Sequence, residues 1–240
     1  MTLLIDFLCR FGWGLSLALA LTPASVVPAG FFRVNLLVVL GLATFAALLE
    51  KSALPGSAWV LPASAAVAAW VGSIAWLAER RAAGIALCLV CAALLAAATA
   101  VLPPVAAVAV TTRLLSGLVV GLTVHAMLLG HWYLNAPGMR VDALRRMIDI
   151  ALVAWGLQLA VAIATLALDT NGIARAAGPT VPALMALRWL AGLAGLPILL
   201  WLSRKTLDIP NTQSATGILY VACLAAIVGE LSGQLLHAAN

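Results

Sequence analysis

The chain alternates between long apolar stretches and short polar connections. Eight stretches are long enough to cross a membrane, at roughly residues 3–21, 31–49, 59–77, 84–102, 105–134, 148–168, 183–202 and 215–236. Each has at least about 19 residues, close to the ~20 that a helix needs to span the hydrocarbon core. Their apolar positions are continuous and do not alternate, which favours helices, because backbone groups in lipid must be paired within the segment. The pattern predicts an all-α bundle of about eight transmembrane helices, with residues 1–240 forming one integral membrane domain.

The second stretch is the least regular, because Arg33 falls in its first turn. Its alternative is a shorter helix, with residues 22–30 forming part of a re-entrant segment. The fifth stretch is long enough that we expect it to tilt or to protrude from the bilayer.

Composition supports a lipid environment. Hydrophobic residues make up 65% of the chain and charged residues 9%, against about 25% charged residues in a typical soluble domain. The net charge of +5 does not indicate a nucleic-acid partner, because the basic residues lie in the connections. Lys51 and Arg175 lie on one side. The opposite side carries Arg33, Arg80, Arg81, Arg140, Arg145, Arg146, Arg204 and Lys205.

Such a bias places the basic connections in the cytoplasm and both termini outside. The sequence therefore predicts a multi-pass protein of the bacterial inner membrane. Its connections are short, so chemistry in the water phase requires a partner subunit.

Five charged residues lie within the apolar stretches, all at the depth of the outer half: Asp6, Arg10, Arg113, Arg188 and Glu230. Ionisable groups at this depth are costly and are usually functional. Asp6 and Arg10 are four residues apart and are expected to form a structural ion pair along one helix face. Glu230 is free to pair with Arg113 or Arg188. Three arginines and two acids leave one positive charge unmatched, which favours a ligand, a water-filled cavity or an acidic group of a partner.

Neighbouring polar residues extend this cluster. Gln158 lies at a similar depth, and Gln234 and His237 share the helix face of Glu230. Arg113 and Arg188 precede glycines that allow close helix contact. A carboxylate accepts protons, and arginine stabilises a developing anion. We therefore assign Glu230 as the candidate catalytic proton acceptor. The candidate cofactor-binding residues are Arg113, Arg188, Gln158, Gln234 and His237.

The histidines and cysteines indicate neither haem nor a metal site. His125 and His131 are six residues apart, about 120° around a helix, so they cannot ligate one iron from opposite sides. His125 is buried without an obvious partner, and a core imidazole bonded to a backbone carbonyl is the plainer interpretation. Cys88 and Cys91 have redox spacing, but their apolar surroundings indicate small packing residues.

Eight crossings with both ends outside, together with residues 215–220 and 229–236 of the last stretch, resemble the membrane-anchor subunits of dimethyl sulfoxide reductase and polysulfide reductase. The resemblance implies a haem-free bundle that binds quinone or quinol. It also implies electron exchange with an iron–sulfur subunit docked on the outer face. Such a chain is a subunit of an oxidoreductase and is not catalytic alone.

Two other classes remain open. Buried charges also line the paths of small-solute or proton transporters, and they also lock the helices of structural or assembly subunits. Transporters often contain inverted repeats with interrupted helices, and the two halves of this sequence show no such repeat. The lack of a recognisable inverted repeat in the sequence favours the redox subunit over a transporter.

Overall fold

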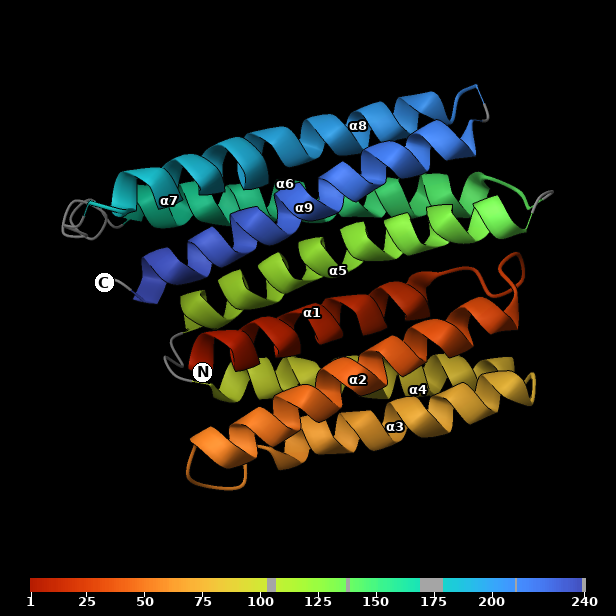
Figure 1. Cartoon of the computed structure of the whole chain (residues 1–240), viewed down its shortest axis with the longest axis horizontal. Helices are drawn as coiled ribbons and strands as arrows, with labels where there is room; N and C mark the ends of the chain where they lie inside the picture. Colours follow the sequence, from red (N-terminus) through yellow and green to blue (C-terminus); the bar gives the residue numbers. More distant parts are fainter. Residues whose placement is uncertain (103–106, 137–138, 169–178, 210, 239–240) are drawn as a thin grey trace.

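The chain folds into a bundle of long helices (Figure 1). The computed structural model describes residues 1–102, 107–136, 139–168, 179–209 and 211–238. The helices are α1 (Thr2–Leu21), α2 (Ala29–Ala53), α3 (Val60–Leu77), α4 (Arg81–Val101), α5 (Ala107–Asn135), α6 (Asp142–Leu168), α7 (Val181–Leu187), the π-helix η2 (Arg188–Gly195), α8 (Leu196–Thr206) and α9 (Thr212–Ala238). No strand occurs in these ranges. The predicted all-α class is confirmed, and the described residues contain eight helical segments that are long and apolar enough to span a membrane.

The observed boundaries differ from the predicted ones where polar residues extend a helix. α6 begins at Asp142, six residues before the predicted start, because an acid in the first turn is favourable at the positive end of a helix. α2 begins directly after Pro28 and takes the longer of its two predicted forms. The shorter form of this helix is therefore wrong, and residues 24–26 form a turn between α1 and α2.

The seventh span contains an irregularity that its sequence explains. α7, η2 and α8 follow one another without interruption and form one span, Val181–Thr206. Pro197 lies in the first turn of α8. Because proline lacks an N–H and its ring clashes with the carbonyl four residues earlier, the wider π turns before it relieve the conflict. Arg188 is the first residue of this π segment.

The spans of the described residues form two groups of four with the same order of contacts, when α7, η2 and α8 are counted as one span (Figure 1). In the first group, α1 packs on α2 and α4, and α3 also packs on both. In the second, α5 packs on α6 and α9, and α8 also packs on both. The groups meet mainly along α1 and α5.

Glycines allow α1 and α5 to approach closely at this crossing. A methyl group added to Gly14 would lie 2.0 Å from the carbonyl oxygen of Gly117, and one added to Gly121 would lie 2.2 Å from the backbone of Gly14. Contacts this short are impossible for a real side chain, so only glycine fits. The crossing places Arg10 of α1 directly against α5.

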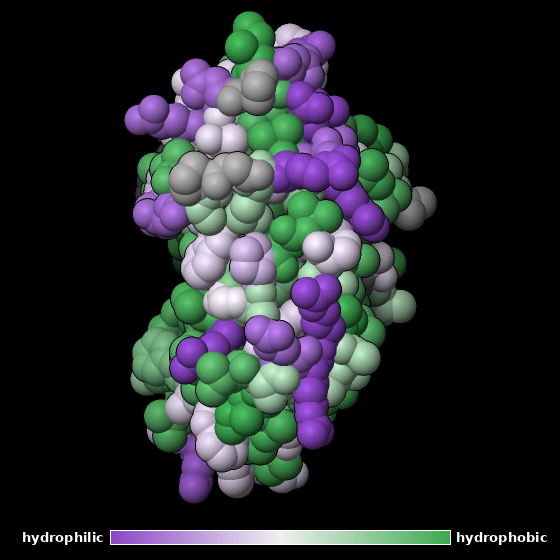
Figure 2. Space-filling model, turned by 90° about the vertical axis from the view of Figure 1, so that its right-hand side faces the viewer, coloured by the Kyte–Doolittle hydropathy of each residue, from purple (hydrophilic) through white to green (hydrophobic). Residues whose placement is uncertain are grey.

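α1 begins and α9 ends at the same end of the bundle, which we call the terminal end (Figure 1). The opposite end, called the basic end, carries the connections rich in arginine and lysine. Viewed from there, hydrophilic side chains gather over the helix ends (Figure 2). Arg175, which belonged to the less basic side in the sequence prediction, lies outside the described residues. The apolar helices indicate a lipid bilayer as the environment.

Candidate functional site

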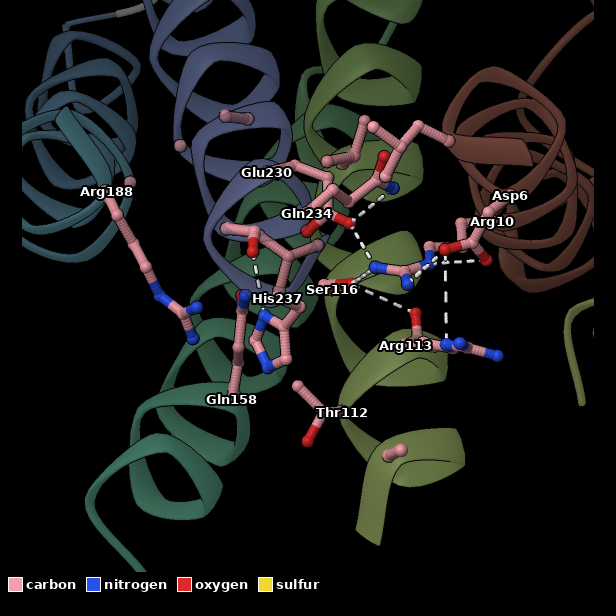
Figure 3. A pocket seen from close by; sticks show the side chains of 18 of the residues that line it. Asp6, Arg10, Thr112, Arg113, Ser116, Gln158, Arg188, Glu230, Gln234 and His237 are labelled. Carbon is pink, nitrogen blue, oxygen red and sulfur yellow. Dashed lines mark hydrogen bonds and ion pairs between the residues drawn. The ribbon is translucent and has the colours of Figure 1, made fainter. Parts of the chain in front are cut away.

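A network of buried ions lies in the terminal half, centred on Arg10 of α1 (Figure 3). Arg10 Nε donates a hydrogen bond to Asp6 Oδ1 at 2.9 Å, and Nη2 forms an ion pair with Asp6 Oδ2. Arg10 Nη1 pairs with Glu230 Oε1 of α9 at 2.5 Å and lies 3.4 Å from Ser116 Oγ of α5. The predicted pair of Asp6 and Arg10 therefore exists, and it extends across three helices.

Arg113 of α5 takes a different position from the one expected. Its Nη1 donates to the carbonyl oxygen of Leu102 at 2.5 Å, at the C-terminal end of α4, where partial negative charge accumulates. Its Nε lies 4.0 Å from Asp6 Oδ2. Arg113 thus ties α5 to α4 and to the ion network.

The expectation that Glu230 pairs with Arg113 or Arg188 is wrong. Its ion-pair partner is Arg10, because α1 lies against both α5 and α9 and directs Arg10 between them. The order of segments along the chain does not reveal that the first and last spans meet.

The polar face of α9 continues outward from Glu230. Gln234 Nε2 donates to Glu230 Oε1 at 3.0 Å, and His237 Nδ1 lies 2.7 Å from the carbonyl oxygen of Gly233. Because a carbonyl only accepts hydrogen bonds, Nδ1 carries the hydrogen, which leaves Nε2 of a neutral His237 ring as a hydrogen-bond acceptor. Among the described residues, Glu230 Oε2 has no hydrogen-bond partner.

Arg188 of η2 and Gln158 of α6 form the opposite side of the site. Both are half-buried, and in Figure 3 the Arg188 side chain extends toward the wall that carries Gln158. Within the described ranges, neither side chain makes a hydrogen bond or an ion pair. Arg188 passes over Gly233 of α9, where an added methyl group would lie 3.2 Å from its Nη1.

These side chains surround one cavity of about 490 Å³. It is lined by every residue that the sequence placed in the outer-half cluster: Asp6, Arg10, Arg113, Gln158, Arg188, Glu230, Gln234 and His237. Leu54, Val119, Leu193 and Ala226 supply apolar wall. The predicted convergence of the buried ions is confirmed as geometry, and their chemical roles stay predictions.

The cavity separates α6 from η2. Gln158 lines it from α6, and Arg188, Gly192 and Leu193 line it from η2. α6 packs on α5 and α8, but it makes no extensive contact with α7 or η2 among the described residues. The two helices flanking the cavity here are thus held apart.

Sequence reasoning missed two residues of the site and one buried acid outside it. Ser116 hydrogen-bonds to Arg10, and Thr112 lines the cavity. Both lie close to Arg113 on α5, so the shared helix face could have revealed them. Glu50 is buried near the end of α2, and its Oε2 has no partner among the described residues. The predicted stretch stopped at residue 49 and excluded this acid.

His125 lies outside the cavity, in the basic half. It is fully buried, its Nε2 lies 2.7 Å from the Thr22 hydroxyl, and its ring meets Phe31 edge-on. The plainer expectation of a backbone-carbonyl partner is therefore wrong. The Thr22 hydroxyl, at the C-terminal end of α1, is the group within hydrogen-bonding distance of His125 Nε2.

The cysteines are free and buried. Cys91 donates a weak hydrogen bond to the carbonyl oxygen of Ala65 at 3.5 Å, consistent with packing between α3 and α4. Within the described part of the chain, no group of three or more histidine, cysteine or acidic residues is arranged to hold a metal ion.

Comparisons with protein-family models, with curated proteins and with solved structures found no match to this chain.

Proposed function

We propose that this chain is a haem-free membrane subunit that binds quinone or quinol and exchanges electrons with a partner redox subunit. One observation carries the proposal. Two carboxylates, two amides, an imidazole and three guanidinium groups from α1, α5, α6, η2 and α9 line one cavity inside an apolar bundle. Its volume of about 490 Å³ falls within the roughly 300–1,000 Å³ of small-molecule sites.

The separation of α6 and η2 supports a ligand that arrives through the membrane. A quinol is apolar enough to reach the cavity laterally between these helices. Apolar walls suit its ring and tail, while the polar groups suit its two oxygens. A water-soluble substrate would not need a route from the lipid between two helices.

The proposed reaction is the oxidation of a quinol to a quinone, which releases two protons and two electrons. Glu230 Oε2 accepts the two ring-hydroxyl protons one after the other, passing on the first before it takes the second, while Arg10 and Gln234 hold Oε1. Protons then leave along Gln234 and His237 toward the terminal end. The electrons pass to the partner, for which the resemblance to reductase anchor subunits suggests an iron–sulfur protein on the outer face of a bacterial inner membrane.

The test replaces Glu230 with glutamine, which keeps the size and removes the proton acceptor. We expect quinol oxidation by the isolated complex to fall by roughly 10²-fold or more, because a positioned general base contributes about 10²–10⁴-fold. Glu50→Gln is the matched control, since Glu50 is also buried but does not line the cavity. Unchanged turnover in Glu230→Gln, with assembly intact, would remove Glu230 from the mechanism.

A transporter is the second candidate, favoured by the two groups of four helices with the same order of contacts. Parallel repeats of this kind occur in transporters that rock one half against the other. Isolation of the chain alone, with solute or proton uptake in vesicles, would support this class. Isolation with a stoichiometric iron–sulfur or molybdenum protein would support the redox subunit. A stoichiometric complex without any response to quinone would leave a structural subunit.

A further inference from the structure

The charges lining the cavity are unevenly paired. Arg10 contacts both carboxylates, and Arg113 faces Asp6 and binds a carbonyl of α4. No carboxylate oxygen of the described residues lies within 4 Å of the Arg188 guanidinium nitrogens. Glu230, the acid on the neighbouring helix α9, is already paired with Arg10. The unmatched positive charge of the cluster is therefore located at Arg188.

The local structure holds Arg188 at the cavity wall. Gly192 of η2 packs against Gly229 of α9, where an added methyl group on Gly229 would lie 2.5 Å from the Gly192 Cα. This close crossing fixes the turn that carries Arg188. Gly233 then leaves room for the guanidinium to lie across α9. A bulkier residue at position 233 would push the guanidinium away from this place.

The cavity consequently has two unlike ends. At one end Glu230 presents a carboxylate that repels anions, and Arg10 is occupied by two acids. At the other end Arg188 and the amide of Gln158 present donors without partners in the described part of the chain (Figure 3). A guanidinium and an amide N–H together bind a charged oxygen strongly, because charge-assisted hydrogen bonds are about twice as strong as neutral ones.

We propose that Arg188 and Gln158 form an anion site within the quinone cavity. This site selects quinoid ligands that carry an ionised oxygen over neutral ligands of the same shape. The inference rests on the proposed quinone binding, which it deepens by naming the ligand class. It also orients the ligand, with the anionic oxygen at Arg188 and a protonated hydroxyl at Glu230.

The experiment uses the full chain in lipid nanodiscs and two probes. 2-Hydroxy-1,4-naphthoquinone is ionised at neutral pH, and 2-methoxy-1,4-naphthoquinone is its neutral analogue. Binding is followed by quenching of tryptophan fluorescence, with empty nanodiscs correcting for partition into lipid. We expect the ionised probe to bind about 10- to 100-fold more tightly, the factor that a hydrogen bond to a charged group supplies.

Variants identify the residues responsible. Arg188→Gln should weaken binding of the ionised probe far more than binding of the neutral probe and so remove the preference, whereas Arg188→Lys should retain part of it. Gln158→Leu should reduce the preference by a smaller factor and decides the matter if Arg188→Gln fails to fold. Arg146→Gln, which removes an exposed arginine at the basic end, should bind both probes as the native chain does.

The possible results separate the two proposals. Equal binding of both probes, or a preference that survives both Arg188→Gln and Gln158→Leu, overturns the anion site and leaves quinone binding standing. If neither probe binds, quinone binding and the anion site are overturned together.

Discussion

At the scale of single residues, Arg10 determines the electrostatics of the bundle. It contacts two buried acids and joins α1 to α9 and α5. Two carboxylates this close would repel each other without the cation between them. Removing one partner of a buried ion pair leaves an uncompensated charge, which costs more than the pair itself contributes.

Replacing Arg10 with glutamine should therefore destabilise the protein strongly, by about 3–5 kcal/mol. Unfolding of the detergent-solubilised chain can be followed with a thiol-reactive dye, because all four cysteines are buried in the folded state. Adding Asp6→Asn and Glu230→Gln to this variant should restore part of the loss. A melting temperature equal to that of the native chain in Arg10→Gln would show that the network does not stabilise the fold.

At the scale of helices, the crossing of α1 and α5 matters most. Gly14, Gly117 and Gly121 bring the two backbones together at the level of the ion network. The separation of these helices sets whether Arg10 reaches Ser116 and Glu230. Helix packing and site geometry therefore depend on the same three positions.

Gly121→Ala should force α1 and α5 apart, since the added methyl group would lie 2.2 Å from the Gly14 backbone. Overpacking of this kind costs roughly 1–3 kcal/mol or more, and we expect a lower melting temperature in the same dye assay. Gly156→Ala is the matched control, because nothing lies within 4 Å of a methyl group there. Equal melting temperatures for both variants would contradict the close crossing.

The sequence predicts individual helices well and their neighbours poorly. Hydropathy located all eight spans, but it reports the apolar part of a helix and so missed the first turns of α6. Depth and helix face predicted that Glu230 and Arg188 approach one cavity. The pairing of Arg10 with Glu230, and of Arg113 with a carbonyl of α4, depends on which helices touch. That information is absent from the periodicity of any single segment.

At the scale of the whole molecule, charge distribution sets orientation. The connections at the basic end contain eight arginine and lysine residues, which predicts that this end faces the cytoplasm. Figure 2 shows hydrophilic side chains over the same end. The cavity then lies in the outer half of the membrane, on the side where a partner for electron transfer is proposed to dock.

Single cysteines introduced at the two ends test this orientation. Ser57→Cys lies in the exposed connection between α2 and α3 at the terminal end, and Gln213→Cys lies in the exposed first turn of α9 at the basic end. A membrane-impermeant maleimide should label Ser57→Cys in intact bacterial cells and Gln213→Cys only after permeabilisation. The native cysteines are buried and should give little background. The reverse pattern of labelling would place the cavity on the cytoplasmic side.

The way the two groups of helices meet has a consequence for how the chain can be cut. The spans of each group contact one another, and the interface between the two groups is formed mainly by α1 and α5. The groups are therefore held together by this interface as well as by the peptide chain after α4. Two separately synthesised fragments, residues 1–102 and 107–240, therefore contain all the residues that form this interface, including the Arg10–Glu230 ion pair. Co-expressed in one membrane, such fragments should find each other and rebuild the cavity, so that covalent continuity is dispensable for assembly.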